Sequence, residues 1–323
     1  MLDGLDNVNW SELEHAYGEA SNVPDMIRGL LSDDPEMREI AQGNLEITIF
    51  HQGTWASATP YAIPFLMEIL LDTQSPEREW LARFISSMMP YQCSEIDWST
   101  FPEVIARHMQ DEANQDVEDE YTARMNQQMQ EMYTNHTPDF IHLLKDNSLE
   151  VRLNMIVLLT KFSCYQDKLY PVLHDLVVTV KNEKERCILA HYSGLFKDSK
   201  ISELAKVILV DDSEPDIVRL GAGFGLIKRM NHIVSTDELK QFIQLATYDN
   251  IEKFNSLYSR YVIMTIVLAY SKWHGIKFLP VAQRRLFVPL FEELIREAKS
   301  RNASNIEQIY VRNFEELDLG QEE

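Results

Sequence analysis

Residues 212–220 read DSEPDIVRL, an acidic turn followed by the start of a helix and an arginine, and this pattern recurs along the chain. The other copies are DDPEMREIA at 33–41, SPEREWLA at 75–82, DNSLEVRLN at 146–154 and KNEKERCILA at 181–190. The arginines that align are Arg38, Arg78, Arg152, Arg186 and Arg219. They are spaced 40, 74, 34 and 33 residues apart, so the long interval is about two periods and holds an insertion.

A repeat of this length predicts an all-α fold, an α-solenoid in which antiparallel helix pairs stack on their neighbours. Gly (11) and Pro (12) are scarce among the 323 residues, which suits helices joined by short turns. We expect one continuous structural domain. Its parts are an N-terminal capping helix over 1–22, repeats over 23–300 with an acidic helical insertion at about 91–136, and a C-terminal acidic tail over 301–323.

Two repeats make specific packing predictions. In the first, an Asp of the Asp33-Asp34-Pro35 turn is expected to cap a helix in which Pro35 lies near the first position. That helix is expected to carry Ile40, Leu45, Ile47 and Phe50 on or near its buried face. In the fifth repeat, GAGFG at 221–225 predicts close helix–helix packing, since a phosphate-binding glycine fingerprint would need a preceding strand.

The recurring arginines have two interpretations. An Asp in each turn can accept hydrogen bonds from the first N–H groups of the next helix, and the arginine can reach the acidic turn of a neighbouring repeat. Alternatively, the arginines point into the concave groove and contact a partner. Because the arginine recurs at one place in each repeat, we favour the structural role.

These repeats are similar to HEAT repeats, especially the short HEAT-like or PBS-lyase-type variety, over about residues 23–230. The N-terminal part also resembles a group of bacterial HEAT-repeat proteins. The shared features are a WxxLxHAYG…VP opening, here from Trp10, and an HQGT…AT…PFL segment, here from His51. The resemblance implies an armadillo-like helical fold and leaves the activity open.

The charge of the chain narrows the choice of partners. A net charge of −21 argues against sequence-independent nucleic-acid binding, although residues 181–200 are locally basic. An acidic surface favours a basic protein partner, or simply keeps the protein in solution. The strip DEANQDVEDE at 111–120 is interpreted as a solvated helix face, with a docking element for a basic partner as the alternative.

Cysteine usage and hydropathy predict a cytoplasmic protein. The three cysteines, Cys93, Cys164 and Cys187, show neither metal-ligand spacing nor a disulfide framework, so we expect no metal and no cofactor. The first ten residues lack the apolar core of a signal peptide. The longest apolar stretch, at 261–270, is too short to span a bilayer.

The candidate binding residues lie in the segments HAYG and HQGT, and they are His15, Tyr17, His51, Gln52 and Thr54. In one interpretation they form a small pocket with two imidazoles at one edge of the solenoid. In the other, which we favour, both segments cap helix C-termini, and Gly18 and Gly53 supply left-handed conformations.

Marks of catalysis are absent from the sequence. It has no His-Glu dipeptide of the kind that binds iron in deoxyhypusine hydroxylases, no HExxH, no P-loop and no GxSxG. We therefore expect a non-enzymatic scaffold that binds a protein partner on its concave surface, with an immunity-type neutraliser of a basic toxin as a more specific version. The alternatives are a ligand binder or enzyme that uses the His15/His51 edge and, least favoured, a nucleic-acid-binding protein. The oligomeric state stays open.

Overall fold

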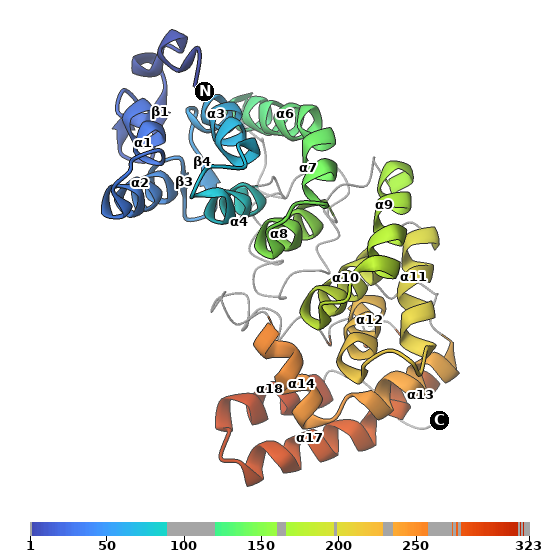
Figure 1. The fold of residues 1–323 in the computed structure, drawn as a ribbon. Coiled ribbons are helices and arrows are strands. Elements are labelled where there is room, and N and C mark those ends of the chain that lie inside the picture. Colours follow the sequence, from blue (N-terminus) through green and yellow to red (C-terminus); the bar gives the residue numbers. More distant parts are fainter. Residues whose placement is uncertain are drawn as a thin grey trace. The chain divides into compact units, whose positions relative to one another are not determined.

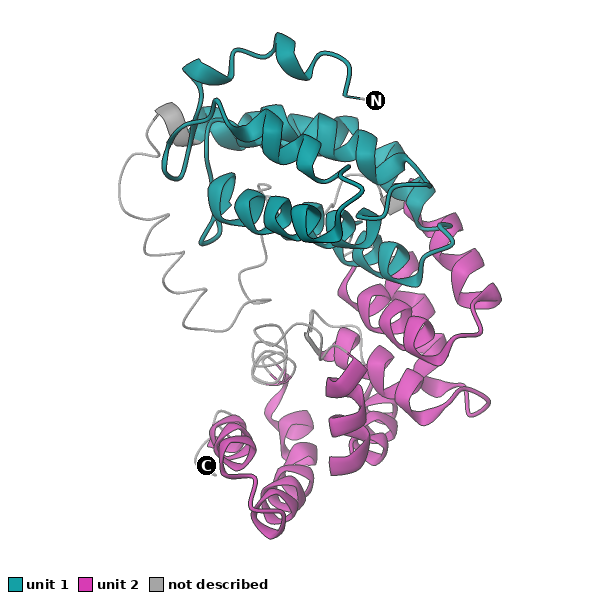
Figure 2. Ribbon diagram, turned by 60° about the vertical axis from the view of Figure 1, so that its left-hand side comes forward, with its two compact units in different colours: residues 1–96, 116–162 teal, residues 97–115, 163–323 magenta. Residues whose placement is uncertain are grey.

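The computed structural model describes residues 2–88, 120–159, 166–196, 199–228, 235–257 and 279–315, together with positions 273, 276, 317 and 319. These residues are predominantly helical, and the only strands among them belong to two short hairpins, so the fold is all-α as predicted. The chain divides into two compact units (Figure 2). Unit 1 comprises residues 1–96 and 116–162, and unit 2 comprises residues 97–115 and 163–323.

The start of unit 1 is not the capping helix expected over residues 1–22. It consists of two 3-10 turns, η1 (Leu5–Asn7) and η2 (Trp10–Glu12), and a hairpin of β1 (Glu14–His15) and β2 (Gly18–Glu19). The Trp10 indole N–H donates to the Leu5 carbonyl at 2.7 Å, and both side chains are buried. Gly18 has a φ of 121°, which a helix does not allow and which turns the chain back instead.

Six of the seven described helices of unit 1 form three pairs (Figure 1). They are α1 (Val23–Gly29), α2 (Pro35–Thr48), α3 (Thr59–Leu71), α4 (Arg78–Met88), α6 (Glu120–Asn135), α7 (Thr137–Leu143) and α8 (Leu149–Leu159). α1 packs on α2, α3 on α4 and α7 on α8, and α6 contacts α3 and α7. In addition, α1 contacts α3 and α4 contacts α8. First helices thus pack beside first helices and second helices beside second helices.

The second helix of the first repeat starts as predicted but buries a different face. Asp34 accepts a hydrogen bond from the Glu36 N–H at 2.9 Å, and Pro35 occupies the first turn. Leu45 is fully buried, whereas Ile40 and Ile47 are 50% and 48% exposed, so their predicted burial is wrong. A second hairpin, of β3 (Phe50–His51) and β4 (Thr54–Trp55), separates this helix from α3.

Unit 2 repeats the same layering. Its helices are α9 (Gln166–Thr179), α10 (Glu183–Leu195), α11 (Ser199–Val210), α12 (Asp216–Lys228), α13 (Thr236–Leu245), α14 (Tyr248–Leu257), α16 (Val281–Arg284), α17 (Val288–Ser300) and α18 (Ser304–Glu315), with the 3-10 turn η5 at Arg285–Phe287. α9, α11 and α13 contact one another in sequence, and so do α10, α12 and α14. α18 lies within the expected tail, which is therefore helical from Ser304 to Glu315.

The contact between α10 and α12 is built on glycines, as the GAGFG segment predicted. A Cβ placed on Gly225 would lie 2.0 Å from the His191 carbonyl oxygen, and one on Gly221 would lie 2.8 Å from the Cys187 carbonyl oxygen. On the other side, a Cβ on Gly194 of α10 would lie 2.5 Å from the Leu226 nitrogen. Backbone meets backbone here, which only residues without side chains allow. Cys187 is fully buried at this contact.

Several expectations fall outside the described residues. They are the conformation of the acidic strip up to residue 119, the surroundings of Cys93 and Cys164, the apolar stretch at 261–270 and most of the segment after Glu315.

Candidate functional site

The two candidate segments form the tips of β-hairpins rather than the ends of helices. HAYG turns between β1 and β2, and HQGT turns between β3 and β4, where Gln52 and Gly53 have φ angles of 51° and 87°. Positive φ at both central residues is typical of a two-residue hairpin. Gly18 and Gly53 therefore do adopt the predicted positive φ, but in hairpins.

Backbone hydrogen bonds hold the first hairpin against the end of α2 and the loop before α3. The Ala16 N–H donates to the Thr48 carbonyl at 2.9 Å, and the Ala58 N–H donates to the Glu14 carbonyl at 3.1 Å. The Glu14 N–H donates in turn to the Ser57 hydroxyl at 2.8 Å. Segments more than 40 residues apart in sequence are thereby joined at one edge of unit 1.

His15 is fixed in one tautomer by its hydrogen bonds. Its Nδ1 accepts the Tyr17 N–H at 3.0 Å, so the ring proton lies on Nε2 and is donated to the Asn22 side-chain oxygen at 3.0 Å. The residue is only 9% exposed. Both ring nitrogens are therefore used in holding the hairpin.

Tyr17 brings the two histidines into one row of rings. Its ring centroid lies 6.4 Å from that of His15 and 5.5 Å from that of His51, in edge-to-face geometry. Tyr17 itself is 65% exposed. His51 donates from Nδ1 to the Ile47 carbonyl at 3.1 Å and so does cap the end of α2.

The remaining candidates lie at the tip of the second hairpin. The Thr54 hydroxyl donates to the His51 carbonyl at 2.7 Å, and Gln52 is exposed at the turn. In the described part of the chain, no group of three His, Cys, Asp or Glu side chains is placed to hold a metal ion. The arrangement as a whole is a row of three rings, those of His15, Tyr17 and His51. Its inner member, His15, is buried and hydrogen-bonded through both ring nitrogens.

The five repeat arginines all make the same type of hydrogen bond to the backbone. Each donates to a backbone carbonyl at the end of the preceding helix or in the turn that follows it. The pairs are Arg38–Ser32 at 2.8 Å, Arg78–Leu70 at 2.8 Å, Arg152–Asp146 at 2.6 Å, Arg186–Val177 at 2.6 Å and Arg219–Leu209 at 3.0 Å. The last carbonyls of a helix lack partners within the helix, so each arginine satisfies groups that would otherwise need water.

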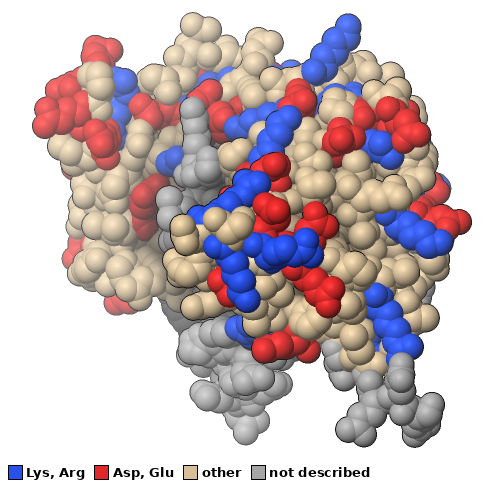
Figure 3. All heavy atoms as spheres, turned by 90° about the horizontal axis from the view of Figure 1, so that it is seen from below, with Lys and Arg blue, Asp and Glu red and all other residues tan. Residues whose placement is uncertain are grey.

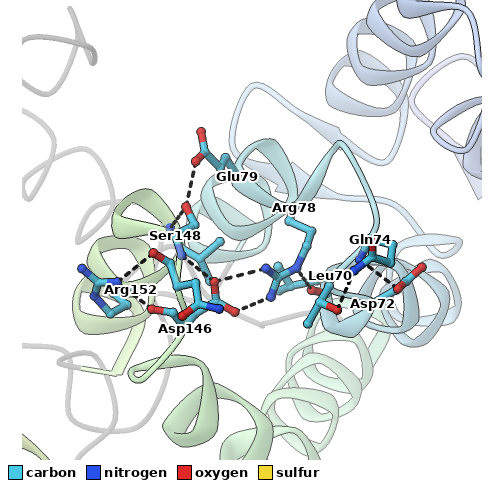
Figure 4. Close-up of polar contacts among 11 residues, drawn as sticks. Leu70, Asp72, Gln74, Arg78, Glu79, Asp146, Ser148 and Arg152 are labelled. Carbon is cyan, nitrogen blue, oxygen red and sulfur yellow. Dashed lines mark hydrogen bonds and ion pairs between the residues drawn. The ribbon is translucent and has the colours of Figure 1, made fainter.

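Three of the arginines also reach an acid in the turn of the next repeat. The pairs are Arg38 with Glu77 at 2.5 Å, Arg78 with Asp146 at 3.1 Å and Arg186 with Glu214 at 3.1 Å. Arg219 instead pairs with Asp212 of its own turn at 2.8 Å. The Arg78 pair joins α4 to the turn before α8, so the 74-residue interval between arginines does not interrupt the row (Figure 4).

The Arg78–Asp146 pair is the most enclosed of these contacts. The two side chains are 11% and 9% exposed, and both guanidinium Nη atoms donate to the carboxylate (Figure 4). Burial alone would raise the pKa of Asp146. Hydrogen bonds from Arg78 and the Ser148 N–H, with the charges of Arg78 and Arg152, outweigh burial and lower that pKa below its ordinary value.

Sequence reasoning found the arginines but not all of their acidic partners. Glu77 directly precedes Arg78, whereas Asp146 and Glu214 precede the arginines of their own repeats by six and five residues. Each turn holds several acids, and only the three-dimensional path of the turn decides which of them faces the previous repeat.

The basic stretch near Lys181 is partly neutralised. Arg186 is committed to Glu214 and to backbone carbonyls, and Glu183 pairs with Lys253 at 2.8 Å. On the face of the molecule drawn in Figure 3, Lys and Arg side chains lie among Asp and Glu side chains. Positive and negative side chains are therefore mixed on that face.

No protein-family model matches the sequence, and no curated protein is similar enough to be matched to it. Among the described residues, no helix combines the length and the apolar character needed to cross a membrane.

Substitutions in the ring row should separate its structural part from its exposed part. His15→Ala removes a buried ring that holds the Tyr17 N–H and Asn22, so it should lower the free energy of unfolding by about 1–3 kcal/mol. Tyr17→Ala, at an exposed tip, should change it by no more than about 0.5 kcal/mol. Urea denaturation followed by circular dichroism measures both. Unchanged stability in His15→Ala would show that the ring is not a structural support.

Proposed function

We propose that the chain is a HEAT-like α-solenoid and acts as a non-enzymatic scaffold for protein–protein interaction. The observation that carries the proposal is the layering inside each unit, where first helices pack on first helices and second helices on second helices. The arginine contacts between successive turns support it, because they repeat one stacking relation along the chain.

The partner would bind on the concave surface of the solenoid, since a small rotation between successive repeats gives such folds an extended concave face. With a net charge of −21, the protein steers basic partners toward itself and repels acidic ones. The ligand-binding alternative at His15 and His51 receives less support, because the hydrogen bonds of the two imidazole rings go to backbone groups and to Asn22.

Capture experiments with the full chain test the proposal. The immobilised protein is exposed to cytoplasmic extract at low and high salt. An unrelated helical protein of similar net charge is treated in the same way, and basic proteins that bind to both are discarded as non-specific. Each enriched protein is then purified and titrated by calorimetry. We expect at least one basic protein to bind saturably and with defined stoichiometry. Failure of every purified candidate to bind would contradict the scaffold function.

A further inference from the structure

The helix α2 uses one face to pack on α1. Ala41 and Leu45 are buried on this face, and a Cβ on Gly29 of α1 would come within 2.8 Å of the Ala41 Cβ. The two helices therefore meet at small residues, and this face of α2 is filled by its own repeat.

A second face of α2 packs on the next repeat. Arg38 and Gln42 both donate to Glu77, which lies just before α4. One turn further along, Glu46 accepts the Trp80 indole N–H at 2.9 Å. Residues 38, 42 and 46 are spaced by four, so they form one line along the helix that faces α4.

A third face of α2 is apolar and remains exposed. Met37, Ile40 and Ile47, which we call the α2 stripe, are 50%, 50% and 48% exposed. At about 100° per residue, the stripe lies about 170° around the helix from the line that faces α4. In Figure 1, α2 lies at the outer end of the unit 1 helices, with α1 and α4 next to it. In a stack of repeats, this is the face on which the second helix of a preceding repeat would pack.

The first hairpin extends the apolar surface beyond the end of α2. The His51 ring is held to the Ile47 carbonyl at 3.1 Å, and the ring of Tyr17 packs on His51. Tyr17 is 65% exposed, whereas Tyr61, another exposed aromatic residue of unit 1, is 42% exposed. The α2 stripe and Tyr17 together offer apolar side chains over the length of a helix of about four turns.

Carboxylates border the α2 stripe. Glu36 and Glu39 are exposed on the adjacent side of the helix, and no described Lys or Arg side chain pairs with either. Residues 2–88 contain fifteen acids, four arginines and no lysine. Each of those arginines already pairs with a carboxylate. Within residues 2–88, the surface around the stripe therefore carries negative charge that no arginine is free to balance.

We propose that the α2 stripe docks an amphipathic helix of a partner protein whose apolar face is bordered by Lys or Arg. Such a helix would pack on α2 in the way that a second helix of a neighbouring repeat packs in a stack, and it would bring cations to Glu36 and Glu39. A second copy of this chain fits less well, because it would bring the carboxylates of both copies together. The inference deepens the scaffold function by naming one of its surfaces and the chemistry of the segment bound there.

Fluorescence anisotropy with a labelled synthetic peptide tests the docking site on the full chain. The probe is about 18 residues long, with leucines along one helical face and lysines on both sides of it. We expect saturable binding that weakens several-fold when the salt concentration rises from about 0.05 to about 0.3 M. The double variant Met37→Gln/Ile40→Gln should weaken binding roughly ten-fold. Both side chains are half exposed, so circular dichroism should show an intact fold.

Three matched controls make the result specific. Val207→Gln changes an apolar residue of α11 that is 59% exposed and should leave binding unchanged. A peptide of the same composition with scattered leucines, and one with glutamate in place of lysine, should both bind at least roughly ten-fold more weakly. Equal binding by the double variant or by the scattered peptide would overturn the inference. So would self-association in sedimentation that Ile40→Gln abolishes, since a second copy would then be the occupant. If basic partners are captured while the peptide fails to bind, the docking site on α2 is contradicted, but the scaffold function is not.

Discussion

Replacing Gly225 with alanine is expected to destabilise unit 2 by about 3 kcal/mol or more. The added Cβ would lie 2.0 Å from the His191 carbonyl oxygen and 3.1 Å from the Gly194 Cα. These are backbone atoms of α10 and cannot turn away as a side chain would, so the two helices must move apart. The loss should appear as a lower midpoint in urea denaturation followed by far-ultraviolet circular dichroism.

Gly43 provides the matched control for Gly225→Ala. It also lies inside a helix, α2, but a Cβ placed there meets nothing within 4 Å. Gly43→Ala should therefore stabilise the protein by about 0.5–1 kcal/mol through helix propensity alone. If both substitutions shift stability in the same direction and by similar amounts, the glycines of α12 are not there for close packing.

Breaking the Arg78–Asp146 pair should give the second large effect. Arg78→Met leaves the Asp146 carboxylate 9% exposed and without its guanidinium partner, and we expect a loss of about 3 kcal/mol. Arg28→Met serves as the control, because the Arg28 and Asp6 side chains are 43% and 78% exposed. That exposed pair should contribute nothing measurable. Equal losses from the two variants would contradict a special role for Arg78.

The same pair predicts how stability responds to acid. The pKa of Asp146 is lower in the folded protein than its ordinary value of about 3.9. The Asp146 carboxylate therefore contributes fully to the free energy of unfolding above about pH 4. This contribution is lost as the pH falls through the lower pKa of the folded state. The stability difference between the wild-type protein and Asp146→Asn should stay constant at neutral pH and shrink below pH of about 4.

Much of the fold could be predicted from short stretches of the sequence. Each arginine copy predicted the start of a second helix, and helices begin beside Arg38, Arg78, Arg152, Arg186 and Arg219. The cap at Asp34 and the close approach at Gly221–Gly225 were also predictable, because both depend on residues with narrow conformational or steric roles. Such features need only a few neighbours in the sequence.

Burial of Ile40 and Ile47 could not be predicted from the same signals. Apolar periodicity shows that a face of a helix suits packing, but it does not show whether another helix is there. The second helix of a neighbouring repeat would cover that face of α2, but Ile40 and Ile47 are about half exposed in this structure. The error thus marks the surface proposed here as a docking site.

The hairpins at HAYG and HQGT were missed for a different reason. Their strands are only two residues long, so they show no alternating pattern. A glycine with positive φ ends a helix and turns a hairpin equally well. The hydrogen bonds that decide between the two come from distant residues such as Thr48 and Ser57.

A double-mutant cycle on Arg78 and Asp146 tests most directly whether the recurring arginine holds one repeat to the next. Arg78→Met, Asp146→Asn and the double variant are compared with the wild-type protein by urea denaturation at neutral pH. The bond from Arg78 to the Leu70 carbonyl is lost in both backgrounds and cancels. We predict a coupling free energy of about 1.5 kcal/mol or more. Additive effects, within about 0.5 kcal/mol, would show that the arginine does not join the repeats.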